Sequence, residues 1–335
     1  MLLVGLIALY SSIIPESGPT FDMRELTEAA RDGGLDEATQ GWIFLVLLIG
    51  FGVLVSLFPF HSWAAPAYAA APTPVAMLHA GVLKKFGLYG LIRVAMPMLP
   101  DGFNADLCGS GWTPHGILMV LLLGNVLYVG LVTISQRHLD RMLGNSSVMH
   151  MGYAFLGIAC VNAIGWGGAV FMMFAHGVSI AALFALCGML RERLDSLEMS
   201  RFGGLAAKMP QFALVFAFAA MASLGLPGFA NFASEVLIFL GAFKGAGDGA
   251  LGSLQVTTIL ALWGVVISAV YMLRAYRNLF QGSLGEDVSP TDLSPAEKLP
   301  IYLLIAALLV TGFFPNLILG PVSPAVNSLL PFFGN

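Results

Sequence analysis

Six ionisable side chains lie inside long apolar stretches of this sequence, where each could take up and release a proton. An unpaired charge is expensive within a membrane, so such side chains face protein, water or a partner. Buried lysine, histidine and carboxyl groups can each be neutral or charged near neutral pH, so together they can pass a proton onward. These residue types therefore predict a proton relay within the membrane. The six residues are His79, Lys84, Lys85, His150, His176 and Glu235.

The two lysines and the glutamate support this prediction most strongly. Lys85 lies about 16 Å from the start of its predicted helix, near the middle of a ~30 Å hydrocarbon core. Lys84 points about 100° away from Lys85 on a helix, so we expect Lys84 to pack against neighbours or to extend to a membrane surface. A membrane histidine often only hydrogen-bonds a neighbouring helix. This alternative stays open for His79 and His176, and it is the expected role of His150.

The composition predicts an integral membrane protein. Of the 335 residues, 58% are hydrophobic and only 10% are charged, and no Asp, Glu, Lys or Arg occurs between Ala38 and Leu83. That run is long enough for two crossings, because each needs ~20 apolar residues. Strand-like alternation of apolar and polar residues is absent, so we expect an all-α, multi-span helical bundle.

The apolar stretches predict nine crossings, separated by short polar loops. They are the opening segment and residues 41–60, 73–98, 114–134, 147–163, 167–190, 211–243, 256–279 and 300–319. The opening segment is short for a full span, and an acidic loop follows it at residues 15–40.

If successive crossings run in opposite directions through the membrane, most Lys and Arg residues of the loops fall on one side. One side receives Arg137, Arg141, Arg191, Arg193, Arg201, Lys208, Arg274, Arg277 and Lys298, and the other receives only Arg24, Arg31 and Lys244. The positive-inside rule makes the Arg-rich side cytoplasmic and the acidic loop external.

Two of the predicted spans are interrupted. Proline removes a backbone donor and clashes with the preceding turn, so Pro59 within Leu57–His61 and Pro227 within Leu224–Phe229 predict two broken helices. Broken helices in both halves of a bundle are typical of inverted repeats with an ion path between them. Glu235 follows the second break, where freed backbone groups can hold water.

Signatures of soluble enzymes and of metal sites are missing. Cys108, Cys160 and Cys187 are isolated, so neither a disulfide framework nor a zinc or iron–sulfur site is indicated. Gly50-Phe51-Gly52 lies inside an apolar span, and no phosphate-binding loop occurs. We therefore expect no cofactor in this chain and no nucleic-acid partner.

Several blocks resemble one family of membrane proteins. FHSWAAPAYAAAPTPVAMLHAGVLKKFGLYGLIR (60–93) resembles the core of the antiporter-like subunits of respiratory complex I. HLDRMLGNSSVMHMGY, FAHGVSIAALFALCGML, FGGLAAKMP and ASLGLPGFANFASEVLIFLGAF follow in the order and spacing of subunit M of the proton-conducting membrane transporter family. The first block is also similar to subunit L and to multi-subunit sodium/proton antiporters.

The resemblance implies roles for individual residues. Lys85 matches the central lysine and Glu235 the exit-side carboxylate, while His176 and His79 match polar residues along the axis. Leu54 stands where the family has a lysine, and the glutamate that pairs with that lysine would lie upstream of Met1. We therefore expect a chain shortened at its beginning, with 1–98 the rest of a first repeat, 99–280 a second repeat, and 281–335 a loop and final helix.

The expected function is proton translocation by a subunit of NADH-quinone oxidoreductase in a bacterial cytoplasmic membrane. Quinone, FMN and iron–sulfur clusters would then belong to partner subunits, and the neighbours would be antiporter-like and small membrane subunits. Two alternatives stay open: a subunit of a sodium/proton antiporter or membrane-bound hydrogenase, and a structural spacer that does not conduct.

Overall fold

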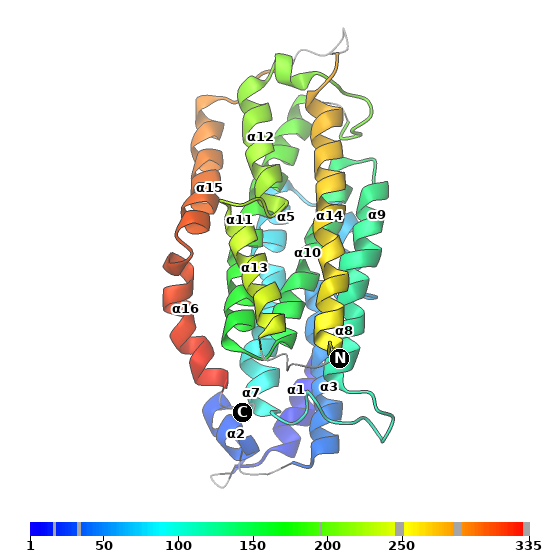
Figure 1. The fold of residues 1–335 in the computed structure, drawn as a ribbon, viewed down its shortest axis with the longest axis vertical. Coiled ribbons are helices and arrows are strands. Elements are labelled where there is room, and N and C mark those ends of the chain that lie inside the picture. The colour runs from blue at the N-terminus through cyan, green and yellow to red at the C-terminus, as the bar shows by residue number, and fades with distance from the viewer. Residues whose placement is uncertain (16–17, 32–34, 195, 245–250, 284–289, 331–335) are drawn as a thin grey trace.

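The computed structural model describes residues 1–15, 18–31, 35–194, 196–244, 251–283 and 290–330. Within these ranges the chain is helical and forms no strand, so the predicted all-α class is confirmed. Figure 1 shows an elongated bundle whose helices run mostly along its long axis. Six helical segments in these ranges are long and apolar enough to cross a membrane.

Two long helices, α10 (Leu139–Ala159) and α11 (Ala163–Arg193), pack against each other and form the centre of the bundle. Every residue of α10 except Asp140 and Arg141 is buried. The predicted crossing at 147–163 is therefore wrong at its start. Polar residues between 139 and 147 lower the hydropathy there, so the sequence placed the start of the helix too late. A helix enclosed by protein can contain such residues, because it needs no apolar surface toward lipid. As a result His150 lies in the middle of its helix and not near an end.

The first predicted break is confirmed between α3 (Glu37–Val55) and α4 (Ala64–Ala70). The α3 helix begins at Asp36, whose carboxylate accepts a hydrogen bond from the Thr39 N–H at 3.0 Å, as expected of an N-cap. The predicted crossing at 41–60 includes most of α3 and part of the break. It omits α4, the half-helix that follows the break.

Asn125 satisfies backbone groups that this break leaves open. It is fully buried in η3 (Gly124–Val129), which joins α8 (Pro114–Leu123) to α9 (Gly130–Ser135) in one span. Its amide group donates to the Ser56 carbonyl at 3.2 Å and to the Val148 carbonyl at 2.9 Å, and its oxygen accepts from the Phe58 N–H. One side chain therefore ties the break to α10.

We expect Asn125→Leu to destabilise the protein while keeping the volume of the side chain. Leucine leaves the Phe58 N–H and the Ser56 carbonyl without partners, and each buried unpaired group costs about 1–3 kcal/mol. The measurement is the unfolding temperature of the purified protein in detergent. Asn327→Leu, an exposed change in α16 (Asn316–Leu329), is the matched control and should leave that temperature unchanged. Equal unfolding temperatures for both variants would contradict the assigned role of Asn125.

The lysine-bearing span occupies residues 73–98, as predicted. It consists of α5 (Thr73–Gly81), η1 (Leu83–Lys85), α6 (Phe86–Gly90), η2 (Leu91–Ala95) and α7 (Met96–Met98). At Val82 the backbone departs from helical angles (φ −128°, ψ −60°), and the Lys85 N–H then bonds to the Val82 carbonyl in a tighter turn. Both lysines therefore lie on an irregular turn within the span.

Two glycines let this span approach α11 closely. A Cβ on Gly81 would lie 3.2 Å from the Gly177 carbonyl oxygen, and a Cβ on Gly177 would lie 2.6 Å from the Gly81 carbonyl oxygen. Small residues at such crossings bring membrane helices into backbone contact. The contact places the lysine turn beside His176, the residue before Gly177.

The second predicted break is confirmed within 211–243. The chain forms α12 (Pro210–Ser223) and α13 (Ala230–Phe243), and the residues between them are not helical. Figure 1 shows these two half-helices stacked end to end along the bundle. The next span, α14 (Ser253–Phe280), agrees with the prediction for 256–279.

The last predicted crossing, 300–319, has the wrong limits. The chain forms α15 (Pro295–Phe313), turns at Phe314 and Pro315, and continues as α16. Pro315 follows the end of α15 and cannot donate the next helical hydrogen bond, which explains the interruption. The predicted division at residues 98 and 280 stays a prediction, and residues 284–289 of its third part lie outside the described ranges.

The acidic loop predicted at 15–40 contains a short amphipathic helix, α2 (Met23–Arg31), after the opening helix α1 (Leu2–Ser12). The predicted segregation of cations agrees with the fold. The Arg-rich segments meet at the upper end of the bundle in Figure 1, where Arg191 pairs with Asp140 at 3.0 Å and Arg193 with Glu297 at 2.7 Å. The α2 helix lies at the opposite end.

Candidate proton relay

Lys84 is fully buried and points into the centre of the bundle. Its Nζ donates to the Ser147 carbonyl of α10 at 3.1 Å and lies 5.8 Å from the centre of the Tyr68 ring. The ammonium thus has one carbonyl acceptor and one aromatic face, which favours a cation there. The expectation that Lys84 could extend to a membrane surface is wrong.

Lys85 is also buried, with 5% of its surface exposed, but its surroundings differ from those of Lys84. Its Nζ donates to the Ala80 carbonyl of its own span, at the irregular turn. The side chain forms part of the wall of an apolar groove of about 780 Å³ between α5 and α11. The two lysines therefore have different acceptors, one on α10 and one on their own helix.

A histidine pair follows the lysines toward the second broken helix. The Ser147 hydroxyl lies 3.1 Å from His176 Nε2, and the His176 ring stacks on His150 with ring centres 5.0 Å apart. Both imidazoles lie within electrostatic reach of both lysines. The sequence favoured a structural role for His150 over a place in the relay, because the predicted span put this residue near its end.

His150 joins the histidine pair to the break between α12 and α13. Its Nδ1 lies 2.8 Å from the Ser146 carbonyl oxygen, and its Nε2 lies 2.9 Å from the Ser223 carbonyl oxygen at the end of α12. Carbonyl oxygens only accept hydrogen bonds, and a neutral imidazole has a single N–H. Only the doubly protonated ring donates to both carbonyls, so the hydrogen bonding at the break depends on the proton held by His150.

Glu235 lies on the other side of this break, in the second turn of α13, and is 4% exposed. Its carboxyl group packs against Gly225, which has a φ of +70° and no room for a Cβ. Gly225 is two residues beyond Ser223, so the break brings the carboxyl group near the acceptor of His150. The phenols of Tyr153 and Tyr271 lie within electrostatic reach of Glu235.

His79 lies to one side of this arrangement and is only half-buried. Its Nδ1 is 3.3 Å from the Tyr68 hydroxyl, and its ring packs edge-on against Trp63. The Tyr68 ring also contacts Lys84, so Tyr68 connects His79 to Lys84. Of the predicted site residues, Lys85, His176 and Glu235 lie along one buried route, and His79 is a branch from it.

We call this route the polar axis and define it by its residues. They are Lys84, Lys85, Ser147, His176, His150, Ser223 and Glu235. Three buried polar atoms beside it have no hydrogen-bond partner: His176 Nδ1, Ser223 Oγ and Asn231 Oδ1. Buried polar atoms are rarely unpaired, and ordered water is their usual partner when protein groups are missing.

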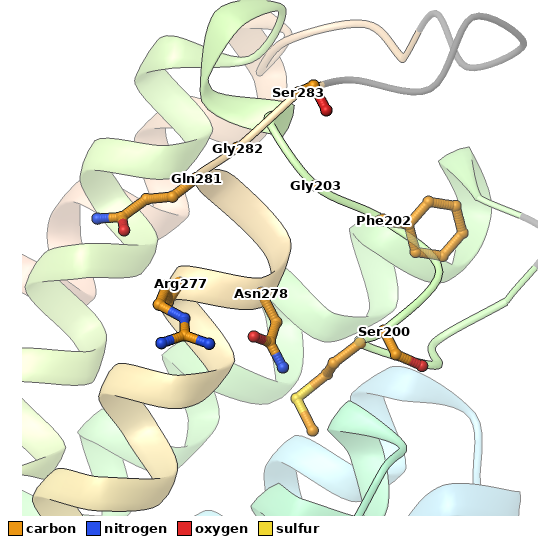
Figure 2. Close-up of a pocket in the computed structure, with 9 residues that line it drawn as sticks. Ser200, Phe202, Gly203, Arg277, Asn278, Gln281, Gly282 and Ser283 are labelled. Atoms are coloured by element: carbon orange, nitrogen blue, oxygen red, sulfur yellow. The ribbon is translucent and has the colours of Figure 1, made fainter.

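No metal site is indicated. Among the described residues, no three His, Cys, Asp or Glu side chains gather as metal ligands would. Figure 2 shows a pocket between the end of α14 and residues 199–203. Its volume is about 540 Å³. It contains Arg277 and Asn278 but no residue of the polar axis. The candidate chemistry is therefore in the buried axis and not in this pocket.

Comparison with known proteins identifies the family. The family model described as "NADH:quinone oxidoreductase/Mrp antiporter, TM" matches residues 1–261. The chain belongs to this family. The NADH:quinone oxidoreductase and Mrp antiporter family was also the resemblance predicted from the sequence blocks.

Individual relatives agree with this assignment. The chain is 37% identical over 307 residues to "NAD(P)H-quinone oxidoreductase chain 4 1" of Picosynechococcus sp., covering 89% of this chain and 54% of the relative. It is 33% identical over 335 residues to "NADH-quinone oxidoreductase subunit M" of Rickettsia felis, covering 99% and 63%. The chain thus spans between about half and two thirds of the length of these family members.

Solved structures share the fold. A chain of respiratory complex I from Thermus thermophilus superposes with a TM-score of 0.86 at 29% identity, covering 100% of this chain and 66% of that one. A chain of the Mrp complex from Dietzia sp. has a TM-score of 0.82 at 19% identity, covering 98% and 65%, which shows the fold alone. The antiporter-like architecture predicted for the family is therefore confirmed.

Proposed function

We propose that this chain forms part of a proton-translocating membrane subunit of a complex I-type NADH-quinone oxidoreductase. The observation that carries the proposal is the polar axis, a buried series of proton-exchanging groups that crosses the centre of the bundle and ends at a broken helix. The relatives named NADH-quinone oxidoreductase subunit M support the same role.

Lys85 stores the proton in this proposal, and Glu235 passes it onward. From the lysine turn the proton moves to His176, which hydrogen-bonds the Ser147 hydroxyl, and then to the stacked ring of His150. Release from His150 breaks one of its two carbonyl contacts, and the proton reaches Glu235 across the break in α12–α13. Water beside His176 Nδ1 and Ser223 Oγ would complete the steps that no direct hydrogen bond covers.

Energy for translocation comes from partner subunits in this proposal. Quinone, FMN and iron–sulfur clusters would be bound there, and this chain would contact antiporter-like and small membrane subunits. The membrane would be the bacterial cytoplasmic membrane. We place the Arg-rich end on the cytoplasmic side, because cytoplasmic loops carry the excess of Lys and Arg.

An antiporter subunit is the second candidate function. The family description names the Mrp antiporter beside the oxidoreductase, and the Mrp complex shares the fold. The same axis would then exchange protons for sodium, as in a cation/proton antiporter or a membrane-bound hydrogenase. Genes for quinone-reducing and iron–sulfur subunits beside this one would favour the oxidoreductase, and a cluster without redox subunits would favour the antiporter.

The proposed function predicts a large effect of Lys85→Met. Methionine is an unbranched side chain only one atom shorter than lysine but cannot carry a proton, so the assembled complex in vesicles should lose at least tenfold in the rate of proton translocation. The readout is acidification followed by a pH-sensitive dye during quinone reduction. Lys208→Met, an exposed change at the Arg-rich end, is the control.

Full translocation by the Lys85→Met complex would contradict the central role of Lys85. A complex that keeps its proton-to-electron ratio after replacement of both Lys85 and Glu235 would instead support the structural spacer. Leu54, in place of the family lysine, is the observation that keeps this alternative in view.

A further inference from the structure

Lys84 has no assigned part in the proposed transfer, yet it is the more deeply buried of the two adjacent lysines. None of its surface is exposed, and it ranks among the largest side chains that are completely enclosed. Its acceptor, the Ser147 carbonyl, belongs to the same residue whose hydroxyl contacts His176. Lys84 therefore lies directly beside the histidine pair.

No carboxylate balances the charge of either lysine in the described part of the chain. The ion pairs found there are Arg191–Asp140, Arg193–Glu297 and Arg201–Glu198, all at the Arg-rich end. A single buried ammonium is costly, and two adjacent ammonium groups also repel each other. The two lysines interact electrostatically, so a proton on one of them disfavours a second proton on the other.

The irregular turn gives each lysine its own place for a proton. Lys85 donates to Ala80 on its own span and borders the apolar groove, whereas Lys84 donates to Ser147 on α10. Each acceptor is a carbonyl oxygen, which stabilises an ammonium by accepting a hydrogen bond. A proton on the pair therefore has two stabilised positions, one toward the groove and one toward the histidines.

We propose that Lys84 is a second proton carrier, and that Lys84 and Lys85 share one transferable proton across the turn. The ammonium of Lys85 gives its proton to the neutral amine of Lys84, so Lys85 becomes neutral as Lys84 becomes charged. Lys84 then gives the proton to the His176 side of the axis and returns to the neutral amine. This inference rests on the proposed translocation and assigns its lysine step to two residues.

The test compares Lys84→Met, Lys84→Arg and Lys85→Met in the assembled complex. We expect Lys84→Met to lower proton translocation at least tenfold, as Lys85→Met does. Arginine keeps a positive charge but does not release a proton, so Lys84→Arg should lose translocation as well. Rescue by arginine would overturn the inference, because it would mean that only a fixed charge is needed at this position.

The double variant, Lys84→Met with Lys85→Met, adds a test that does not depend on the size of either loss. If both lysines carry the same proton on one route, removing either one already blocks the route. The translocation rate of the double variant should then lie within about twofold of the rates of the single variants, because the effects of strongly coupled residues do not add. A double variant whose fold-loss in translocation rate equals the product of the two single fold-losses would overturn the proposal that the lysines share one proton. The amount of assembled complex, measured for each variant, separates lost transfer from lost folding.

The outcomes separate this inference from the proposed function. Loss with Lys85→Met and normal translocation with Lys84→Met would overturn the role of Lys84 alone. Normal translocation with both single variants would overturn the proposed function itself. Lys208→Met remains the matched control for the removal of one positive charge.

Discussion

Replacing Glu235 with glutamine is expected to abolish proton translocation by the assembled complex, with a loss of at least a hundredfold. The amide has nearly the same shape as the carboxyl group and fits the same space beside Gly225. It cannot bind or release a proton, so a proton that reaches His150 has no carrier beyond the break. The measurement is dye-monitored acidification of vesicles, with the rate of quinone reduction recorded in parallel.

The matched control for this change is Glu192→Gln, because Glu192 is exposed at the end of α11. It should translocate protons at the normal rate. A complex with Glu235→Gln that still translocates at more than half the normal rate would remove Glu235 from the route. Normal amounts of assembled complex are expected for both variants, since a neutral amide is easier to bury than a carboxylate at position 235 and position 192 is exposed.

The breaks in the helices could be predicted from the sequence because they follow from local chemistry. Pro59 and Pro227 lack the N–H that a continuous helix needs, and Gly225 adopts a φ of +70° that other residues avoid. Such effects act within one turn of the chain. They need no knowledge of what packs around the helix.

The start of α10 and the role of His150 could not be predicted in the same way. Hydropathy measures how well a segment suits lipid, but α10 is enclosed by other helices and is buried at every position except Asp140 and Arg141. The polar residues in its first half, including Asn145 and Ser146, were therefore left outside the predicted crossing. That error placed His150 near the end of a span, which favoured a structural role over a proton-carrying one.

The burial of the Lys84 side chain against α10 could not be predicted from the sequence for a related reason. The expected angle of 100° between Lys84 and Lys85 holds for a regular α-helix, but the backbone at Val82 leaves helical geometry just before them. The turn instead buries both side chains and gives them separate acceptors. Only the packing of α5 against α11 through Gly81 and Gly177 explains why this irregular turn lies next to His176.

His150→Gln is the second change with a large expected effect, a loss of at least tenfold in proton translocation. Glutamine has its N–H donors on a single nitrogen, so it can hold either the Ser146 or the Ser223 carbonyl and preserve the packing of α10. It cannot alternate between one and two donors, which is what couples the ring to the break in α12–α13. Translocation should fall while the amount of assembled complex stays normal.

His115→Gln is the matched control, because His115 packs against Phe103 at the start of α8 and contacts no residue of the polar axis. Its complex should translocate protons normally. If His150→Gln behaved like this control, the proton would have to pass from His176 to Glu235 without His150. The unpaired Nδ1 of His176 and the unpaired amide oxygen of Asn231 would then mark another polar path toward the break. A normal rate for His150→Gln would therefore redirect the route through α13 and leave its two ends, the lysine pair and Glu235, in place.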